Sequence, residues 1–223
     1  MKLTDQDIEA IARRIAGDLR GGSAAPAAAP AAAPSAAAPS IPSGVVGVFP
    51  TVDEAVAAAK AAFPVFSALP LSRREQVIQS IRAVMRENAT ALAKSAYDET
   101  GYGRFEDKIL KNQLVLEKTP GTEDLPPTAW SGDHGLSLME YAPYGIIGAI
   151  TPTTNPTSSI ICNAIAMLAA GNVAVFNVHP SARRCSIETV ALINQAVMAA
   201  GGPPNTIVCI GESSIESAGQ LMQ

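Results

Sequence analysis

Polar residues cluster at three places in the second half of the chain, each directly after a short apolar segment. The clusters are TPTTN (151–155), NVHPS (177–181) and GES (211–213). If the apolar segments are parallel strands, all three clusters emerge at the carboxyl edge of one sheet, where such sheets bind ligands. This convergence predicts a site for a nucleotide-type ligand. The alternative is that these residues form ordinary turns and helix caps.

Asn155 is the residue in these clusters whose purpose is least obvious. In the stretch GAITPTTNPTSSIICNAI (148–165) it lies between Pro152 and Pro156, ahead of an apolar segment of helical length. Its carboxamide can cap the helix that Pro156 begins, because asparagine is favoured just before a helix and proline at its first position. The chain has neither a GxGxxG nor a Walker motif, so the usual phosphate-binding signatures are missing.

Strands and helices must alternate around these clusters to bring them together. We expect apolar strands and helices in turn at 144–150, 156–170, 172–178, 181–200, 205–210 and 213–221. Such alternation predicts a doubly wound parallel sheet, and short apolar strands suit a sheet covered on both faces. The fold class is therefore α/β, with an incomplete Rossmann-like sheet preceded by N-terminal helices. We also expect an unpaired strand edge and apolar surface where the sheet is unfinished.

Three helices are predicted ahead of the sheet, at 51–66, within 71–101 and at 104–116. Thr51 is the expected cap of the first helix. Ser72 and Glu75 have the spacing of a capping box in the second. Its expected buried face comprises Val77, Ile78, Ile81, Val84 and Met85.

A strand is also predicted between these helices and the sheet, at 136–142. Its residues alternate in polarity, and Leu136, Leu138 and Tyr141 are expected on packed faces.

The first 44 residues differ from the rest of the chain. Residues 1–20 predict a short amphipathic helix with Ile8, Ile11, Ile15 and Leu19 on one stripe. Residues 21–44 place proline at regular intervals among alanines, which favours a semi-extended linker. A helix of this length is marginal alone in water. We therefore expect its apolar stripe to dock on a partner; the alternative is a frayed terminus without function.

Composition excludes several classes of protein. The net charge of −4 gives no basic field suited to nucleic acid. No run of about twenty apolar residues could cross a bilayer, and no signal peptide opens the chain. His134 and His179 are far apart and form no metal-binding spacing with the three cysteines. We expect a soluble, intracellular protein with reduced thiols and no metal.

Several separated motifs, in order, resemble one enzyme family. The segment ITPTTNPTSSIICNAIAMLAAGNVAVFNVHPSARRCS (150–186) is similar to the CoA-acylating branch of the aldehyde dehydrogenase superfamily. It resembles in particular the propionaldehyde and acetaldehyde dehydrogenases of bacterial microcompartments. The stretches LEKTPGTEDLPP, GDHGLSLMEYAPYGIIGAI and LINQAVMAAGGPPNTI agree with this resemblance. It covers residues 45–223, and residues 1–44 resemble the encapsulation peptides of microcompartment cargo.

The resemblance implies roles for the three polar clusters. Asn155 matches the family's oxyanion-hole asparagine, a neutral donor whose protonation does not vary with pH. At the second cluster, hydrolytic relatives carry a lysine and often an acid that holds the adenosine ribose, where this chain has His179 and Ala182. The resemblance favours NAD without excluding NADP, and it implies coenzyme A as cosubstrate. The cofactor-binding residues that it implies are Thr151, Pro152, Thr153, Thr154, His179, Pro180, Ser181 and Gly211.

None of the three cysteines matches the family's nucleophile. Cys162 and Cys209 lie in apolar segments and are expected in the core. Cys185, next to Arg183 and Arg184, could have a lowered pKa. We expect the nucleophilic cysteine to lie beyond residue 223, so that residues 45–223 are the N-terminal part of the nicotinamide-cofactor-binding domain and are inactive alone.

The resemblance implies an oxidoreductase. It would convert a short aldehyde, coenzyme A and NAD to acyl-CoA and NADH as cargo in a microcompartment lumen in the cytoplasm, docked to a shell protein through residues 1–20. It also implies a homo-oligomer, with the strand at 136–142 in the oligomerisation region. The alternatives are a shell-targeting fragment without activity and a hydrolytic aldehyde dehydrogenase that makes a free acid.

Overall fold

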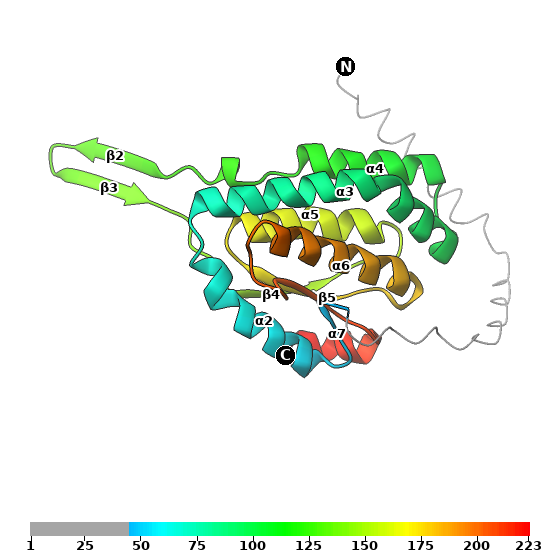
Figure 1. Cartoon of the computed structure of the whole chain (residues 1–223). Helices are drawn as coiled ribbons and strands as arrows, with labels where there is room; N and C mark the ends of the chain where they lie inside the picture. The colour runs from blue at the N-terminus through cyan, green and yellow to red at the C-terminus, as the bar shows by residue number, and fades with distance from the viewer. Residues whose placement is uncertain (1–44) are drawn as a thin grey trace, which may run out of the picture. The chain divides into compact units, whose positions relative to one another are not determined.

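The computed structural model describes residues 45–223, so the predicted helix 1–20 and linker 21–44 lie outside the described residues. The described part contains a parallel sheet of four strands with helices on both faces (Figure 1). The strands are β1 (Val48–Phe49), β4 (Ile146–Ile150), β5 (Val173–Asn177) and β6 (Ile207–Ile210). Their order across the sheet is β1-β6-β5-β4, and every neighbouring pair is parallel. The predicted doubly wound α/β architecture is confirmed.

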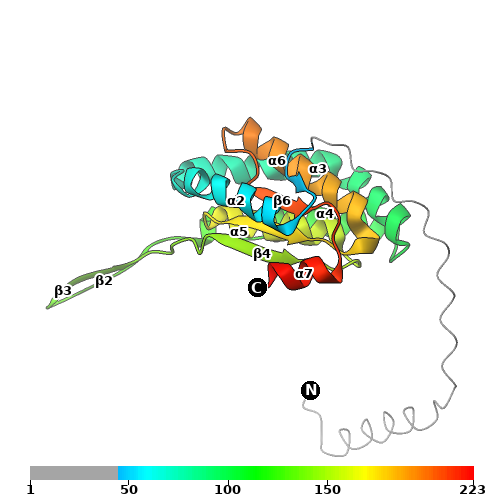
Figure 2. The ribbon, with the colours of Figure 1, turned by 90° about the horizontal axis from the view of Figure 1, so that it is seen from below.

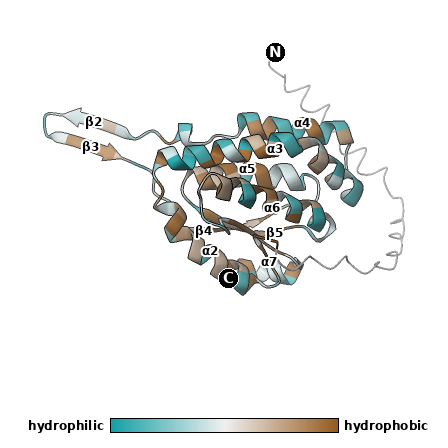
Figure 3. Ribbon diagram, viewed as in Figure 1, coloured by the Kyte–Doolittle hydropathy of each residue, from teal (hydrophilic) through white to brown (hydrophobic). Residues whose placement is uncertain are grey.

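The strands differ in how deeply they are buried. All residues of β5 and β6 are buried, as short apolar strands between two layers of helices require. β4 lies at one edge, so the prediction of a buried strand there is wrong: Ile150 is 53% exposed. β1 lies at the other edge, where it pairs with β6. The sequence did not predict β1. Figure 3 shows β4 and β5 in the colours of hydrophobic residues.

Helices pack in layers on this sheet (Figures 1 and 2). α2 (Val52–Ser67) and α7 (Ile215–Leu221) cover one face, and α5 (Pro156–Ala169) and α6 (Arg183–Ala199) cover the other. α3 (Leu71–Thr100) packs on α5 and α6, and α4 (Phe105–Lys118) packs on α3 and α5. α5 therefore lies against the sheet on one side and against α3 and α4 on the other.

The helix signals of the sequence are partly confirmed. Thr51 caps α2 by accepting from the N–H of Glu54. The buried face of α3 includes Val77, Ile78, Ile81 and Met85, and Gly101 ends the helix with φ +67°. The capping box of Ser72 and Glu75 is wrong, because α3 already begins at Leu71 after Pro70.

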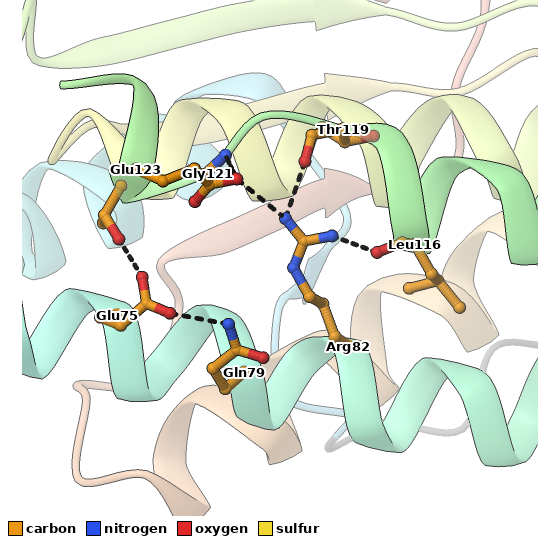
Figure 4. Close-up of polar contacts among 8 residues, drawn as sticks. Glu75, Gln79, Arg82, Leu116, Thr119, Gly121 and Glu123 are labelled. Carbon is orange, nitrogen blue, oxygen red and sulfur yellow. Dashed lines mark hydrogen bonds and ion pairs between the residues drawn. The ribbon is translucent and has the colours of Figure 1, made fainter.

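Glu75 instead belongs to a polar network that joins α3 to the end of α4 (Figure 4). Its carboxylate accepts from Gln79 and from the hydroxyl of Thr122. Arg82, only 9% exposed, donates to the carbonyls of Leu116 and Thr119. These carbonyls lie at the C-terminal end of α4, where a helix leaves carbonyls unpaired and favours a cation. The network therefore fixes the position of α4 on α3.

A two-stranded antiparallel hairpin extends away from the helices and the sheet (Figures 1 and 2). It consists of β2 (Thr128–Gly132) and β3 (Gly135–Met139), and every residue in both strands is exposed. The predicted strand at 136–142 is therefore present in part. The packed faces expected for it are wrong within the described residues, because Leu136 and Tyr141 are 72% and 69% exposed.

Within residues 45–223, no helix combines the length and apolar character needed to cross a bilayer.

Candidate functional site

The three polar clusters lie together at the carboxyl edge of the sheet, as the sequence predicted. The N–H of Thr151, which follows β4, donates to the carbonyl of Asn177 at the end of β5 over 3.2 Å. The Asn177 carboxamide donates in turn to the carbonyl of Ser214, after β6, over 3.3 Å. Arg183 donates to the carbonyl of Ser213 over 3.3 Å. Hydrogen bonds thus connect the ends of all three strands.

Asn155 occupies the N-cap position of α5, but its side chain makes no capping hydrogen bond. The structural alternative, a carboxamide used as a cap, is therefore wrong. Pro156 at the first helical position removes one N–H that would need a partner. The Asn155 Oδ1 atom instead accepts from the Lys111 ammonium over 3.0 Å. The Nδ2 atom is 3.5 Å from the Thr154 hydroxyl, at the long limit of a hydrogen bond.

The threonines before Asn155 differ in exposure. Thr151 is 3% exposed and Thr153 is half-buried, and their hydroxyls have no hydrogen-bond partner among residues 45–223. Pro152 and Thr154 are exposed, and the Thr154 carbonyl accepts from Lys108 over 3.2 Å. Buried hydroxyls normally have hydrogen-bond partners. Two hydroxyls without a partner next to Asn155 are therefore consistent with a site where a polar ligand binds.

An open hollow of about 380 Å³ lies beside Asn155, between α4, α5 and the end of β4. It is lined by Lys111, Val115, Ile150, Thr151, Pro152, Asn155, Ser158, Ser159, Cys162 and Asn163. Cys162 is half-buried in this wall, so its predicted place in the core is wrong. The hollow combines a cation, a carboxamide and hydroxyls with apolar side chains, which suits a small polar molecule.

The second strand end uses the polar groups of His179 and Ser181 locally. His179 is exposed, and its Nδ1 atom accepts from the N–H of Ser181 over 3.1 Å. Pro180 and Ser181 are also exposed and begin a short 3-10 turn, η2 (Pro180–Ala182). α6 therefore starts at Arg183, two residues later than predicted.

The third strand end keeps one unpaired group. Gly211 is buried, and its N–H donates to the Phe49 carbonyl over 2.7 Å, which continues the pairing of β6 with β1. The Ser213 side chain is 2% exposed, and its hydroxyl has no partner among residues 45–223. The Gly211 N–H is therefore already used by the sheet, whereas the Ser213 hydroxyl is a buried polar group without a partner in the described part.

Two cysteines are chemically protected. Burial raises the pKa of the Cys185 thiol, and the neighbouring Glu99 carboxylate raises it further. The expected lowering of this pKa by Arg183 and Arg184 is therefore wrong. Burial also raises the pKa of Cys209 to about 12, in agreement with its predicted place in the core.

Four residues that contribute to this site were missed by sequence reasoning. Glu99, at the end of α3, accepts from the N–H groups of Arg184 and Cys185 and so caps α6 from another helix. Lys108, Lys111 and Asn112 lie on one face of α4 and contact the turn around Asn155 and the start of α5. Their helical spacing is a signal that they share a face, but local sequence does not say what that face meets.

No three histidine, cysteine, aspartate or glutamate side chains of the described part lie close enough together to hold a metal ion.

Comparison with known proteins identifies the family. The sequence profile of the aldehyde dehydrogenase family matches residues 49–223. The chain belongs to this family. An acetaldehyde dehydrogenase (acetylating) of Bilophila wadsworthia is 47% identical over 178 residues, which cover 80% of this chain and 36% of that protein. The chain therefore spans little more than a third of that relative's length.

Solved structures of related enzymes agree with the fold. A propionaldehyde dehydrogenase from the Clostridium phytofermentans fucose utilisation bacterial microcompartment is 50% identical, with a TM-score of 0.76 over 78% of this chain and 40% of that one. A Rhodopseudomonas palustris propionaldehyde dehydrogenase, solved with bound CoA and an acylated cysteine, is 49% identical with a TM-score of 0.77. The match covers 79% of this chain and 40% of the Rhodopseudomonas chain.

Proposed function

We propose that residues 45–223 are the cofactor-binding part of a CoA-acylating aldehyde dehydrogenase. The reaction joins a short aldehyde, propanal or acetaldehyde, to coenzyme A while NAD is reduced, so that the products are acyl-CoA, NADH and a proton. The observation that carries this proposal is the Asn155 carboxamide, which lies in the part of the chain that matches the family and is not used to cap its own helix. The similarity to an acetylating acetaldehyde dehydrogenase and to a propionaldehyde dehydrogenase supports the substrate class.

Asn155 is the proposed donor to the reacting oxygen. A cysteine thiolate outside residues 1–223 adds to the aldehyde carbon, and the carbonyl oxygen takes the negative charge. The Asn155 Nδ2–H stabilises that charge with a fixed dipole, at no cost of reorganisation during the reaction. Because Oδ1 accepts from Lys111, the carboxamide has one orientation, in which the nitrogen makes only the long 3.5 Å contact with the Thr154 hydroxyl.

The residues at the sheet edge fit a dinucleotide. The hydroxyls of Thr151, Thr153 and Ser213 are unpaired within residues 45–223, so they can bond to ribose or phosphate groups. The His179 Nε2 atom is the free nitrogen of an exposed ring at the second strand end. With Pro152, Thr154, Pro180, Ser181 and Gly211, these residues would hold the dinucleotide. When bound, it supplies the hydride acceptor for oxidation of the aldehyde carbon.

Coenzyme A is the proposed acyl acceptor, by analogy with the Rhodopseudomonas enzyme that binds it. Ala182, buried at the position where hydrolytic relatives often carry an acid, offers no carboxylate to a ribose. This difference favours the CoA-acylating reaction over the release of a free acid.

The activity test uses the natural polypeptide that contains residues 1–223. In parallel, residues 45–223 replace the corresponding part of the Clostridium phytofermentans enzyme. Propanal and acetaldehyde are supplied with NAD or NADP, with and without CoA, and the products are identified by mass spectrometry. Acyl-CoA formation that requires CoA and prefers NAD is expected. Free acid at a rate indifferent to CoA, or no product from the hybrid, contradicts the proposal.

We further propose that residues 1–20 bind a microcompartment shell protein and that the enzyme resides in the compartment lumen. The microcompartment origin of the Clostridium relative supports this location. A fluorescent reporter carrying residues 1–44 is expected to gather in puncta in shell-forming cells, and residues 21–44 alone serve as the control. A diffuse reporter contradicts the targeting role.

The exposed hairpin of β2 and β3 is the proposed oligomerisation element. Leu136, Leu138 and Trp130 are each more than half exposed on it, which is unusual for large apolar side chains. Charged substitutions at Leu136 and Leu138 are expected to lower the molecular mass of the assembly in light scattering, whereas an unchanged mass contradicts this role.

A further inference from the structure

One face of α4 contacts the turn that carries Asn155 at three successive places. Lys108 donates to the Thr154 carbonyl, Lys111 to the Asn155 Oδ1 atom, and Asn112 accepts from the Thr157 hydroxyl over 3.0 Å. These three residues occupy adjacent turns of one helix, and the residues that they contact are nearly consecutive. α4 therefore acts as a support for the turn.

The support is itself fixed to the body of the domain. Asn112 is 1% exposed, and its carboxamide nitrogen donates to the Ala89 carbonyl of α3 over 3.1 Å. Arg82 of α3 holds the carbonyls at the end of α4 (Figure 4). Lys108 is 7% exposed, and its pKa is lowered by burial and by the charge of Lys111. Buried polar groups fully engaged in this way fix one arrangement of the elements that they join.

Lys111 determines which end of the Asn155 carboxamide is free. An ammonium group has donors and no acceptor, so it pairs with the amide oxygen and opposes the amide nitrogen. Oxygen and nitrogen diverge from the same planar carbon, and holding the oxygen on α4 turns the nitrogen away from α4. The hydrogen bond from the ammonium therefore favours the orientation in which the amide oxygen faces Lys111 over the flipped one.

We infer that Lys111 is a positioning residue of the oxyanion site, which orients the Asn155 carboxamide so that its N–H groups face the reacting oxygen. This inference rests on the proposed function of Asn155. The positive charge also polarises the carboxamide and makes its N–H a stronger donor. Lys111 does not itself touch the reacting atoms in this role; it acts through Asn155.

Substitutions of Lys111 separate orientation from general stabilisation. Lys111→Arg keeps a cationic donor and should retain kcat within about threefold. Lys111→Met removes the donor and should lower kcat about tenfold, since the carboxamide is no longer fixed. Lys111→Glu supplies an acceptor that attracts the amide nitrogen to α4, and the loss should approach the hundredfold expected of losing the donor. Lys118→Glu, an exposed lysine on the same helix, is the matched control and should leave kcat unchanged.

A double-mutant cycle then tests whether Lys111 acts through Asn155. In an Asn155→Ala background, Lys111→Met should cause no further loss of kcat, because there is no carboxamide left to orient. The KM values for NAD and CoA should stay constant in the series. Equal losses in both backgrounds, or a rise in these KM values with kcat unchanged, overturn the inference and assign Lys111 to binding an anionic cosubstrate.

A spectroscopic measurement needs no enzymatic activity. In the 223-residue chain labelled with ¹⁵N-asparagine, the side-chain N–H₂ resonances of Asn155 should be sharp and sensitive to Lys111→Met, and unaffected by Lys118→Glu. Unchanged Asn155 resonances in Lys111→Met overturn the contact. If the contact is observed and the wild-type enzyme makes no acyl-CoA, the proposed function fails while the orientation of Asn155 by Lys111 stands.

Discussion

Asn155 and His179 both precede a helical segment at the carboxyl edge of the same sheet, yet their side chains are used differently. The His179 ring caps its own turn through Nδ1, as polar residues in that position normally do. The Asn155 carboxamide leaves its helix uncapped and is held by a lysine 44 residues earlier in the chain. The first strand end also keeps buried threonine hydroxyls without partners in the described part, beside a hollow.

The contrast shows how a fold separates polar groups for structure from polar groups for chemistry. At the second strand end, His179 and Glu99 satisfy the backbone N–H groups of η2 and α6. At the first, proline removes an N–H and α4 provides the contacts, so that the Asn155 side chain makes no hydrogen bond to its own helix. A carboxamide that does not cap its own helix can point toward a ligand, whereas the orientation of a capping side chain is fixed by the backbone N–H that it accepts from.

The largest expected difference is in the reactivity of the cysteines. Cys162 lies beside the hollow at the first strand end, whereas Cys185 and Cys209 are buried elsewhere. At pH 8 a thiol with a pKa of about 12, that of Cys209, is ionised in about one molecule in ten thousand. Burial and the Glu99 carboxylate disfavour the Cys185 thiolate as well. Native chain treated with iodoacetamide should therefore be modified much faster at Cys162, which lines the open hollow, than at the two buried cysteines, as measured by peptide mass spectrometry.

Unfolding in urea should make all three cysteines reactive, which serves as the internal control. Comparable labelling of Cys162 and Cys209 in the native chain would break the contrast between an open and a closed strand end.

Substitution of Asn155 separates catalysis from capping. Asn155→Ala should lower kcat about a hundredfold to a thousandfold, the usual result of removing an oxyanion donor. Its free energy of unfolding should stay near the wild-type value, because the carboxamide makes no capping bond. Thr51→Ala is the reverse control: it removes a real cap and should lower that free energy by about 1 kcal/mol without changing kcat. Similar destabilisation by both substitutions would mean that Asn155 is a structural cap.

Substitution of Glu99 tests the closed end and has the smallest expected effect. Each carboxylate oxygen accepts one N–H of α6, and a glutamine can accept at one oxygen only. Glu99→Gln should lower the free energy of unfolding by about 1 kcal/mol in urea titration. It should also lower the pKa of Cys185, because a negative charge beside the thiol is lost while burial still keeps the pKa above its ordinary value.

Glu87→Gln is the matched control, since this exposed residue lies on the same helix and its carboxylate has no hydrogen bond within residues 45–223. If Glu99→Gln and Glu87→Gln change the free energy of unfolding equally, the hydrogen bonds from α6 to Glu99 do not stabilise the second strand end. The contrast with the first strand end would then be weaker.

Local patterns predicted most of the elements and the edge at which the site lies. Alternating apolar strands and helices gave the parallel sheet, and Thr51 and Gly101 mark a helix start and a helix end correctly. The same patterns failed where a neighbour decides the outcome. β4 lies at an edge, Glu75 bonds to Thr122 instead of capping its helix, and the hairpin residues Leu136 and Tyr141 are exposed.

The sequence by itself determined the alternation of strands and helices from β4 to α7, the polar clusters at the strand ends and the motif that contains Asn155, because periodicity, proline and cap residues act over a few positions. Tertiary structure decided that Cys162 faces the hollow, that Glu99 raises the pKa of Cys185, and that the Asn155 oxygen is bound to Lys111. These outcomes depend on groups more than twenty residues apart in the chain, which meet only when α3, α4, α5 and α6 pack together.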